Sequence, residues 1–218
     1  MLKIWGRRDA LNVQKVLWCC AEVGADFELI NAGRQYGVVN TAEFLARNPN
    51  ARVPTLEDGD LVLWESNTIV RYLSAKYSFG KLYPENLGQR AASEKWMDWK
   101  LTTVFMPYFR PLYLTMLRVP KDRQDRAQID EWQQKVCEKL SILDRHLASH
   151  LFVAGERLTM GDIPIGTLVG RWYGIDLKRP SMRHLEAWYA RICDRPGYRE
   201  HVINEIESQL GKGGVTTI

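Results

Sequence analysis

Several patterns that carry chemistry in other proteins are missing from this sequence of 218 residues. Its four cysteines, Cys19, Cys20, Cys137 and Cys193, show neither the C-x-x-C spacing of a redox motif nor paired metal-ligand spacing, and its four histidines are scattered. No stretch approaches the roughly 20 apolar residues of a membrane span, and no run of like charges is dense enough for a nucleic-acid-binding arm. We therefore expect no metal, no membrane and no nucleic acid among its partners.

The first residues also lack the apolar core and the cleavage site of a signal peptide, so we expect a cytoplasmic protein. What is present is typical of a globular chain. Hydrophobic residues make up 45% of the sequence, with eight Trp and nine Tyr, which is enough for one large or two small domains with real cores. The net charge of +4 is a mild imbalance that is spread along the chain.

The first third of the chain alternates short strands with helices. Its apolar spacing predicts a strand over 2–6, a helix over 11–23 that Gly24 ends, and a second strand over 27–30. A strand, helix, strand unit of this kind forces a parallel pair. A short helix and a β-hairpin follow, and the last helix of this part begins at Ser66, so the order of elements is βαβαββα. The remaining elements of this part are predicted over 42–46, 54–56 and 61–63.

Turn-forming residues predict a surface linker over 79–87, and everything after it has helical spacing. A long aromatic helix over 89–118 contains Pro107 and Pro111, where lost backbone hydrogen bonds predict a bend. A capping box with Asp in the acidic position, Thr159-Met160-Gly161-Asp162, opens a later helix. Two shorter helices are predicted over 182–193 and 196–207. We therefore divide the chain into a first domain, 1–78, the linker, 79–87, and an all-helical second domain, 88–218.

The segment Arg52-Val53-Pro54-Thr55-Leu56 holds the first candidate binding feature. Pro54 precedes a short apolar run, and proline cannot donate a hydrogen bond to a sheet ladder. The residue is therefore either a plain strand-opening proline or the second half of a cis Val53-Pro54 bond. A cis bond would leave the N–H and C=O of Val53 free to pair with an extended ligand, as an added strand would.

The pair Glu65-Ser66 stands where an alternating segment gives way to helical spacing. Ser66 is expected to be the N-cap of that helix, and a helix N-terminus attracts carboxylates through its free N–H groups and its dipole. Glu65 beside it can take an ammonium group. The two neighbours would together satisfy an amino acid head group, although an ordinary capped helix with a solvated Glu65 explains the same residues.

These motifs resemble those of cytosolic glutathione transferases. The resemblance covers nearly the whole chain and rests on the phrase from Asn48 to Leu56, on Trp64-Glu65-Ser66-Asn67, on the Thr-x-x-Asp box and on the order of elements. The chain is most similar to bacterial theta-like or nu-like members of the family. The resemblance implies a thioredoxin-like first domain with a mixed four-stranded sheet, an all-α second domain, glutathione as co-substrate, a homodimer and a role in detoxification.

The resemblance also implies roles for particular residues. In the family the Val-Pro bond is cis and the valine backbone pairs with the cysteinyl part of glutathione, which assigns that role to Val53 and Pro54. Glu65 and Ser66 hold the γ-glutamyl head group. Arg52 stands where relatives have a basic residue near the glycyl end, although a surface arginine is also ordinary at this place. Glu94 aligns with an acidic residue that some theta members send across a dimer interface.

One departure from the family concerns the thiol. Theta-like members carry a Ser or Thr hydroxyl after the first strand that stabilises the glutathione thiolate, and Ala10 occupies that position here. Asn12 matches an asparagine that nu-like members place near the sulfur, and its amide can donate a hydrogen bond. We therefore predict that Asn12 stabilises the thiolate, assisted by the backbone N–H of Leu11 or of Asn12. Asn12 as a simple helix cap is the alternative.

The predicted function is the addition of glutathione to small apolar electrophiles, with peroxide reduction as a further activity. Two alternatives stay open: a glutathione-binding protein with little transferase activity, which Ala10 would permit, and a glutathione-dependent disulfide reductase of the nu-like kind. The candidate electrophile pocket is aromatic, although aromatic side chains at this spacing also build cores. Its residues are Phe105, Tyr108, Phe109, Tyr113 and Trp172.

Overall fold

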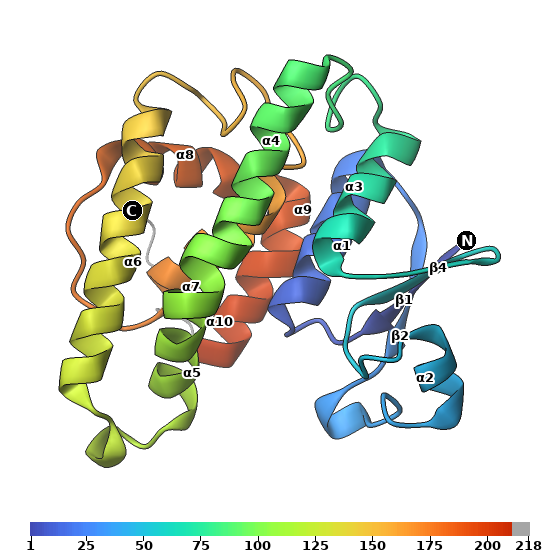
Figure 1. The fold of residues 1–218 in the computed structure, drawn as a ribbon, viewed down its shortest axis with the longest axis horizontal. Helices are drawn as coiled ribbons and strands as arrows, with labels where there is room; N and C mark the ends of the chain where they lie inside the picture. The colour runs from blue at the N-terminus through green and yellow to red at the C-terminus, as the bar shows by residue number, and fades with distance from the viewer. Residues whose placement is uncertain (211–218) are drawn as a thin grey trace.

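The computed structural model describes residues 1–210 and consists of a sheet-containing half and a helical half that lie side by side (Figure 1). Residues 211–218, the end of the predicted second domain, lie outside the described part. The elements of the first half are β1 (Leu2–Gly6), α1 (Leu11–Val23), β2 (Phe27–Asn31), η1 (Arg34–Tyr36), α2 (Ala42–Arg47), β3 (Thr55–Asp58), β4 (Leu61–Trp64) and α3 (Ser66–Tyr77).

The sheet has the strand order β2-β1-β3-β4, in which β1 pairs in parallel with β2 and antiparallel with β3. The hairpin of β3 and β4 sets Thr55 opposite Trp64. This arrangement confirms the predicted βαβαββα order and the mixed four-stranded sheet. In Figure 1, α1 and α3 stand between the sheet and the helical half, whereas α2 lies on the outer side.

The second half is helical, as predicted. Its elements are α4 (Leu87–Trp99), the π-helical stretch η2 (Lys100–Phe109), α5 (Arg110–Arg118), η3 (Lys121–Arg123), α6 (Arg126–Leu147), α7 (Asp162–Gly174), α8 (Arg183–Cys193), α9 (Pro196–Tyr198), a second π-helical stretch η4 (Arg199–Ile203) and α10 (Asn204–Leu210). No helix within residues 1–210 is both long and apolar enough to cross a membrane.

The long helix predicted over 89–118 needs a correction. The chain is helical from Leu87, but ten residues in its middle form a π-helix that contains Pro107. In a π-helix each N–H bonds to the carbonyl five residues earlier, instead of four as in an α-helix. Pro107 has no N–H to donate, so it interrupts this π-helical hydrogen-bond pattern. Pro111 lies at the junction where η2 passes directly into α5.

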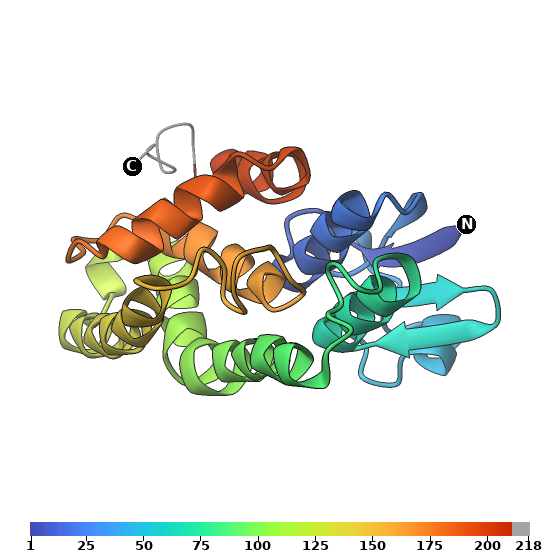
Figure 2. The same ribbon diagram turned by 90° about the horizontal axis from the view of Figure 1, so that it is seen from above.

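The two halves share a packed interface, which Figure 2 shows from above with α1 and α3 at the junction. Trp18 of α1 is fully buried, and its ring lies 4.7 Å from that of Tyr198. The Nε1 of Trp18 donates to Glu22 Oε1 at 2.7 Å, and Arg195 of the helical half donates to the same carboxylate. Residues from both halves therefore fix the position of α1, whose first residues are among the predicted site residues.

Candidate functional site

The peptide bond between Val53 and Pro54 is cis, which settles the first of the open interpretations. The Nδ2 of Asn48 holds the turn by donating to the Arg52 carbonyl at 2.9 Å and to Thr55 Oγ1 at 3.0 Å. Among the hydrogen bonds of residues 1–210, none uses the N–H or the carbonyl of Val53. The Val53 backbone is therefore free to pair with an extended peptide.

The beginning of α3 differs from the prediction. The N-cap is Glu65, whose φ of 71° is rare for a residue with a side chain, and Ser66 is the first helical residue. The carbonyl of Glu65 accepts the first helical bond, from the N–H of Ile69 at 3.0 Å. The N–H groups of the first turn thus lack helical acceptors and can bind a carboxylate, while the Glu65 side chain is exposed beside them.

Ser66 has a partner that the sequence analysis missed. The Nζ of Lys15, from the buried face of α1, donates to Ser66 Oγ and to Asn67 Oδ1, both at 3.1 Å. Burial lowers the pKa of Lys15 to about 8, and nearby Lys100 and Glu65 raise it against that effect. One signal in the sequence could have shown this contact. Lys15 lies four residues before Cys19 and therefore on the same face of the helix, which is otherwise buried.

The N-terminus of α1 presents a second set of free donors. Ala10 is the N-cap and provides no side-chain cap, and the first turn contains no acidic residue. Asn12 is therefore not the cap, and its Oδ1 is buried with no hydrogen-bond partner within the described part of the chain. The buried guanidinium of Arg171 lies nearby, with its Nη2 at 3.4 Å from the Asp9 carbonyl. Positive potential thus gathers at this helix end.

The predicted pocket aromatics meet in part. Phe109 is the centre of the group, with ring centroids 6.3 Å from Phe105, 5.6 Å from Tyr113 and 6.4 Å from Trp172. Phe109 and Trp172 are essentially closed to solvent, so they belong to the core as it stands. Phe105 and Tyr108 are half-buried and pack against that core. An apolar ligand would therefore meet Phe105 and Tyr108 before the other three residues.

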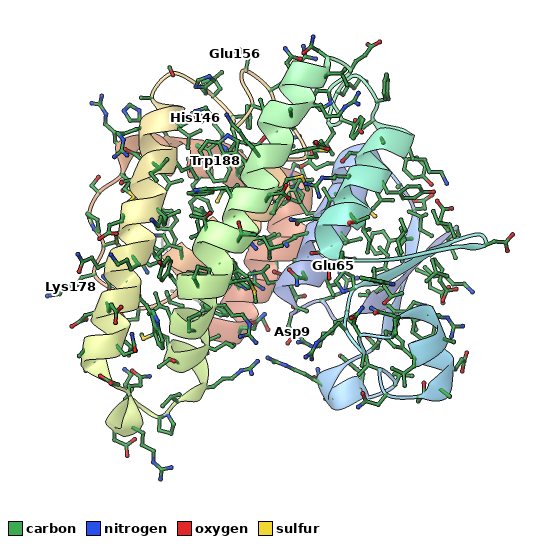
Figure 3. The ribbon with its side chains drawn as sticks, viewed as in Figure 1. Asp9, Glu65, His146, Glu156, Lys178 and Trp188 are labelled. Atoms are coloured by element: carbon green, nitrogen blue, oxygen red, sulfur yellow. The ribbon has the colours of Figure 1, made fainter. Side chains whose placement is uncertain are left out.

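Glu94 and Arg52 are the remaining residues that the resemblance assigns to the site. The Glu94 carboxylate lies 3.5 Å from Arg71 Nε, and Asp98 accepts from the same guanidinium at 2.9 Å, so both acids of α4 face α3 of their own chain. Arg52 is exposed beside the cis bond. Figure 3 shows Asp9 and Glu65 on the side of the first half that faces the helices, so the two helix N-termini border the same junction.

Comparisons with known proteins agree with this geometry. The family model described as "Glutathione S-transferase, N-terminal domain" matches residues 1–75, and its counterpart "Glutathione S-transferase, C-terminal domain" matches residues 97–196. The sequence is 38% identical over 206 residues to Glutathione S-transferase GstB of Escherichia coli K12, covering 93% of this chain and 98% of that protein. The chain belongs to the glutathione S-transferase family, which makes glutathione transferase its class of enzyme and glutathione its co-substrate.

Solved structures place the chain more narrowly. The theta-class glutathione S-transferase of Xanthomonas axonopodis pv. citri, with glutathione bound, superposes with a TM-score of 0.88 at 43% identity, covering 93% of this chain and 97% of that one. A delta-class glutathione transferase of Nilaparvata lugens gives a TM-score of 0.85 at 26% identity, with coverage of 95% and 96%. The resemblance to bacterial theta-like enzymes is therefore confirmed.

Proposed function

We propose that this glutathione transferase binds glutathione along the first half, 1–78, and adds its thiolate to small apolar electrophiles that enter from the helical half, 88–218. The observation that carries the proposal is the cis Val53-Pro54 bond, which leaves the Val53 backbone unpaired. The pairing of Thr55 with Trp64 brings this bond beside the beginning of α3 and its free N–H groups. A peptide with an amino acid head group matches that pair of features. The theta-class relative from Xanthomonas has been solved with glutathione bound.

Each part of glutathione has a proposed partner. The backbone of Val53, held by Pro54, pairs with the cysteinyl unit. The α-carboxylate of the γ-glutamyl unit lies against Ser66 and the first N–H groups of α3, and the exposed Glu65 carboxylate takes the ammonium group. Arg52, exposed at the entrance of the turn, pairs with the glycyl carboxylate.

The thiol lies at the N-terminus of α1 in this proposal. Ala10 offers no hydroxyl, so the amide of Asn12 and the backbone N–H groups of Leu11 and Asn12 donate to the sulfur instead. The field of α1 is not opposed by an acid in the first turn. Each pKa unit removed from the thiol corresponds to about 1.4 kcal/mol of thiolate stabilisation, which one or two charge-assisted hydrogen bonds supply.

The electrophile lies against the half-buried Phe105 and Tyr108, with Phe109, Tyr113 and Trp172 as the wall behind them. The thiolate sulfur of glutathione attacks the electrophile. The attack either displaces a leaving group or adds the sulfur across a double bond. We further propose that the enzyme is a cytoplasmic homodimer with a detoxifying role, and that Glu94 of α4 lies near the partner subunit.

A panel of three substrates tests the proposal. A chloronitroarene, an organic peroxide and a disulfide are each supplied with glutathione, and product formation is followed together with glutathione affinity. Conjugation of the chloronitroarene supports the transferase. Tight binding of glutathione with no turnover of any substrate would favour a binding protein, and turnover of the disulfide alone would favour a disulfide reductase. Such a reductase would use the thiols of two glutathione molecules and needs no cysteine of the protein.

A further inference from the structure

Two lysines meet inside the junction of the two halves, where a lysine is rarely found. Lys15 of α1 is 1% exposed and Lys100, the first residue of η2, is 0% exposed. The Nζ of Lys100 has no hydrogen-bond partner within residues 1–210, and it lies 4.1 Å from the centre of the Phe105 ring. Burying an amine without a counter-ion costs free energy. Two buried lysines side by side therefore need an explanation.

The charges around the pair explain its protonation. Burial lowers the pKa of Lys100 well below its usual value, and the neighbouring Lys15 and Arg171 push it in the same direction. The pKa of Lys15 is also lowered by burial, but Lys100 and Glu65 raise it, so that it stays near 8 while Arg171 opposes them. The surroundings therefore favour the proton on Lys15, which has Ser66 Oγ and Asn67 Oδ1 as acceptors, over Lys100, whose Nζ has none within the described residues.

The protonated Lys15 controls the direction of the Ser66 hydroxyl. An ammonium group has three donors and no acceptor, so Ser66 Oγ can only accept from it. The hydroxyl hydrogen of Ser66 must then point away from Lys15. A neutral Lys15 would have a lone pair and could accept that hydrogen instead. Asn67 fixes the geometry, because its Oδ1 accepts from Lys15 while its Nδ2 donates to the Met97 carbonyl of α4 at 3.3 Å.

We propose that Lys15 is a positioning residue for the α-carboxylate of the γ-glutamyl unit. The proposal rests on the proposed role of Ser66. Protonated Lys15 turns the Ser66 hydroxyl toward the ligand and places a positive charge behind it. When Lys15 loses its proton, the hydroxyl can turn inward and the charge is lost, so the carboxylate loses both attractions.

The binding experiment uses two ligands whose thiols are blocked by a methyl group, so that thiol titration plays no part. One is S-methylglutathione, and the other is the S-methyl form of γ-aminobutyryl-Cys-Gly, which keeps the amino group but lacks the α-carboxylate. Lys15→Met is expected to weaken S-methylglutathione on the order of ten-fold, the scale of one charge-assisted hydrogen bond. It should leave the second ligand within about two-fold. Lys95→Met, which removes an exposed lysine of α4, is the matched control and should change neither.

The pH experiment measures protons taken up on binding, by calorimetry in buffers of different ionisation enthalpy. Near pH 8 the wild type is expected to take up a fraction of a proton when S-methylglutathione binds, because the carboxylate favours protonated Lys15. The Lys15→Met variant should take up less, keeping only the part that the amino group of the ligand takes up when Glu65 binds it as ammonium. Lys100→Met removes the group that raises the Lys15 pKa, so the pH at which affinity falls should move to a lower value.

The results separate this proposal from the proposed glutathione site. If Ser66→Ala changes the affinity of neither ligand, the site itself is wrong. If Ser66→Ala weakens S-methylglutathione selectively but Lys15→Met weakens both ligands equally or neither, Lys15 is only structural and the positioning role is overturned. Should Lys15→Met fail to fold, proton uptake by the wild type decides the matter: uptake that is equal in wild type and Ser66→Ala contradicts the proposal.

Discussion

At the scale of single residues, the proposed stabilisation of the thiolate rests on Asn12, because Ala10 stands where theta-like relatives have a hydroxyl. Asn12→Ala removes the side-chain amide at the second position of α1, whereas the amide of Gln14 already donates to the Arg8 carbonyl. We expect the pKa of bound glutathione to rise by about one unit, the equivalent of about 1.4 kcal/mol, and turnover at neutral pH to fall about ten-fold, with glutathione affinity within a few fold. The thiolate absorbance of the bound peptide, followed against pH, measures the shift.

Asn12→Ser is the matched control, because it keeps a donor at the same position. It should retain most of the turnover that Asn12→Ala loses. If Asn12→Ala changes neither the thiol pKa nor turnover, the backbone N–H groups of α1 stabilise the thiolate without help from a side chain.

Glu65, in the proposed glutathione site, has a strained backbone. Its φ of 71° places the Cβ in a region that side chains avoid, and such a conformation costs of order 1–3 kcal/mol. Glu65→Gly is therefore expected to raise the free energy of unfolding by about 1 kcal/mol, since part of the relief is offset by the greater freedom of glycine in the unfolded chain. Urea denaturation measures the change.

Glu65→Ala separates strain from charge. Both variants lose the carboxylate and should bind glutathione equally weakly, but only the glycine variant loses the strained Cβ. Equal stability of the two variants would show that the strain at this position is negligible.

At the scale of elements, the N-terminus of α7 depends on one buried carboxylate. Asp162 accepts from the N–H groups of Val153 and Thr159, both at 2.9 Å, and from Trp188 Nε1 at 3.0 Å. The predicted capping box is half present: Asp162 accepts from the Thr159 N–H, and the Thr159 hydroxyl donates to the same carboxylate instead of capping the helix. Asp162→Ala leaves these donors buried without an acceptor and is expected to cost about 3–5 kcal/mol in chemical denaturation.

The same residue predicts a pH dependence. Burial raises the pKa of Asp162 from 3.8 to about 6, although its donors pull the pKa down. A folded pKa above the unfolded one means that the contribution of this group to stability is complete below about pH 4 and declines as pH rises through 6. Asp162→Asn cannot titrate, so the stability difference, wild type minus variant, should fall between pH 4 and pH 6. A difference that stays constant over this range would contradict the raised pKa.

The elements that the sequence predicts well have local signals. Helix α1 has the predicted bounds because Gly24 adopts a φ of 65°, which glycine tolerates, directly after the last turn. The π-helical stretch η2 was missed because apolar spacing does not distinguish a π-helix from an α-helix. The bond from Lys15 to Ser66 joins residues 51 positions apart, and no local pattern reports such a contact. Local patterns thus suffice to propose the residues that face the ligand, while contacts such as the one from Lys15 to Ser66 depend on tertiary packing.

At the scale of the whole molecule, the two halves act as one unit because their interface is built from large side chains. Trp18 of α1 packs against Tyr198 and against the surface of α7 at Gly166. The Glu22 carboxylate joins Trp18 to Arg195 across the same junction. Helix α1, which begins at the proposed thiol site, is therefore fixed in place by contacts with the helical half. A substitution that disturbs this interface should also disturb the glutathione site.

Gly166→Ala tests that coupling. A Cβ at Gly166 would lie 2.7 Å from Trp18 Cζ3 and 2.8 Å from its Cη2, so the indole or α7 must move. Helix propensity alone would favour alanine by about 1 kcal/mol, yet we expect a loss of about 1–3 kcal/mol from overpacking and weaker glutathione binding. Gly88→Ala in α4 is the matched control, because its Cβ would meet only Asn86 Oδ1, at 3.2 Å. Thermal unfolding followed by tryptophan fluorescence and by circular dichroism should show one coincident transition in the wild type and in Gly88→Ala. Coincident transitions and unchanged glutathione affinity in Gly166→Ala would mean that the interface does not support the site.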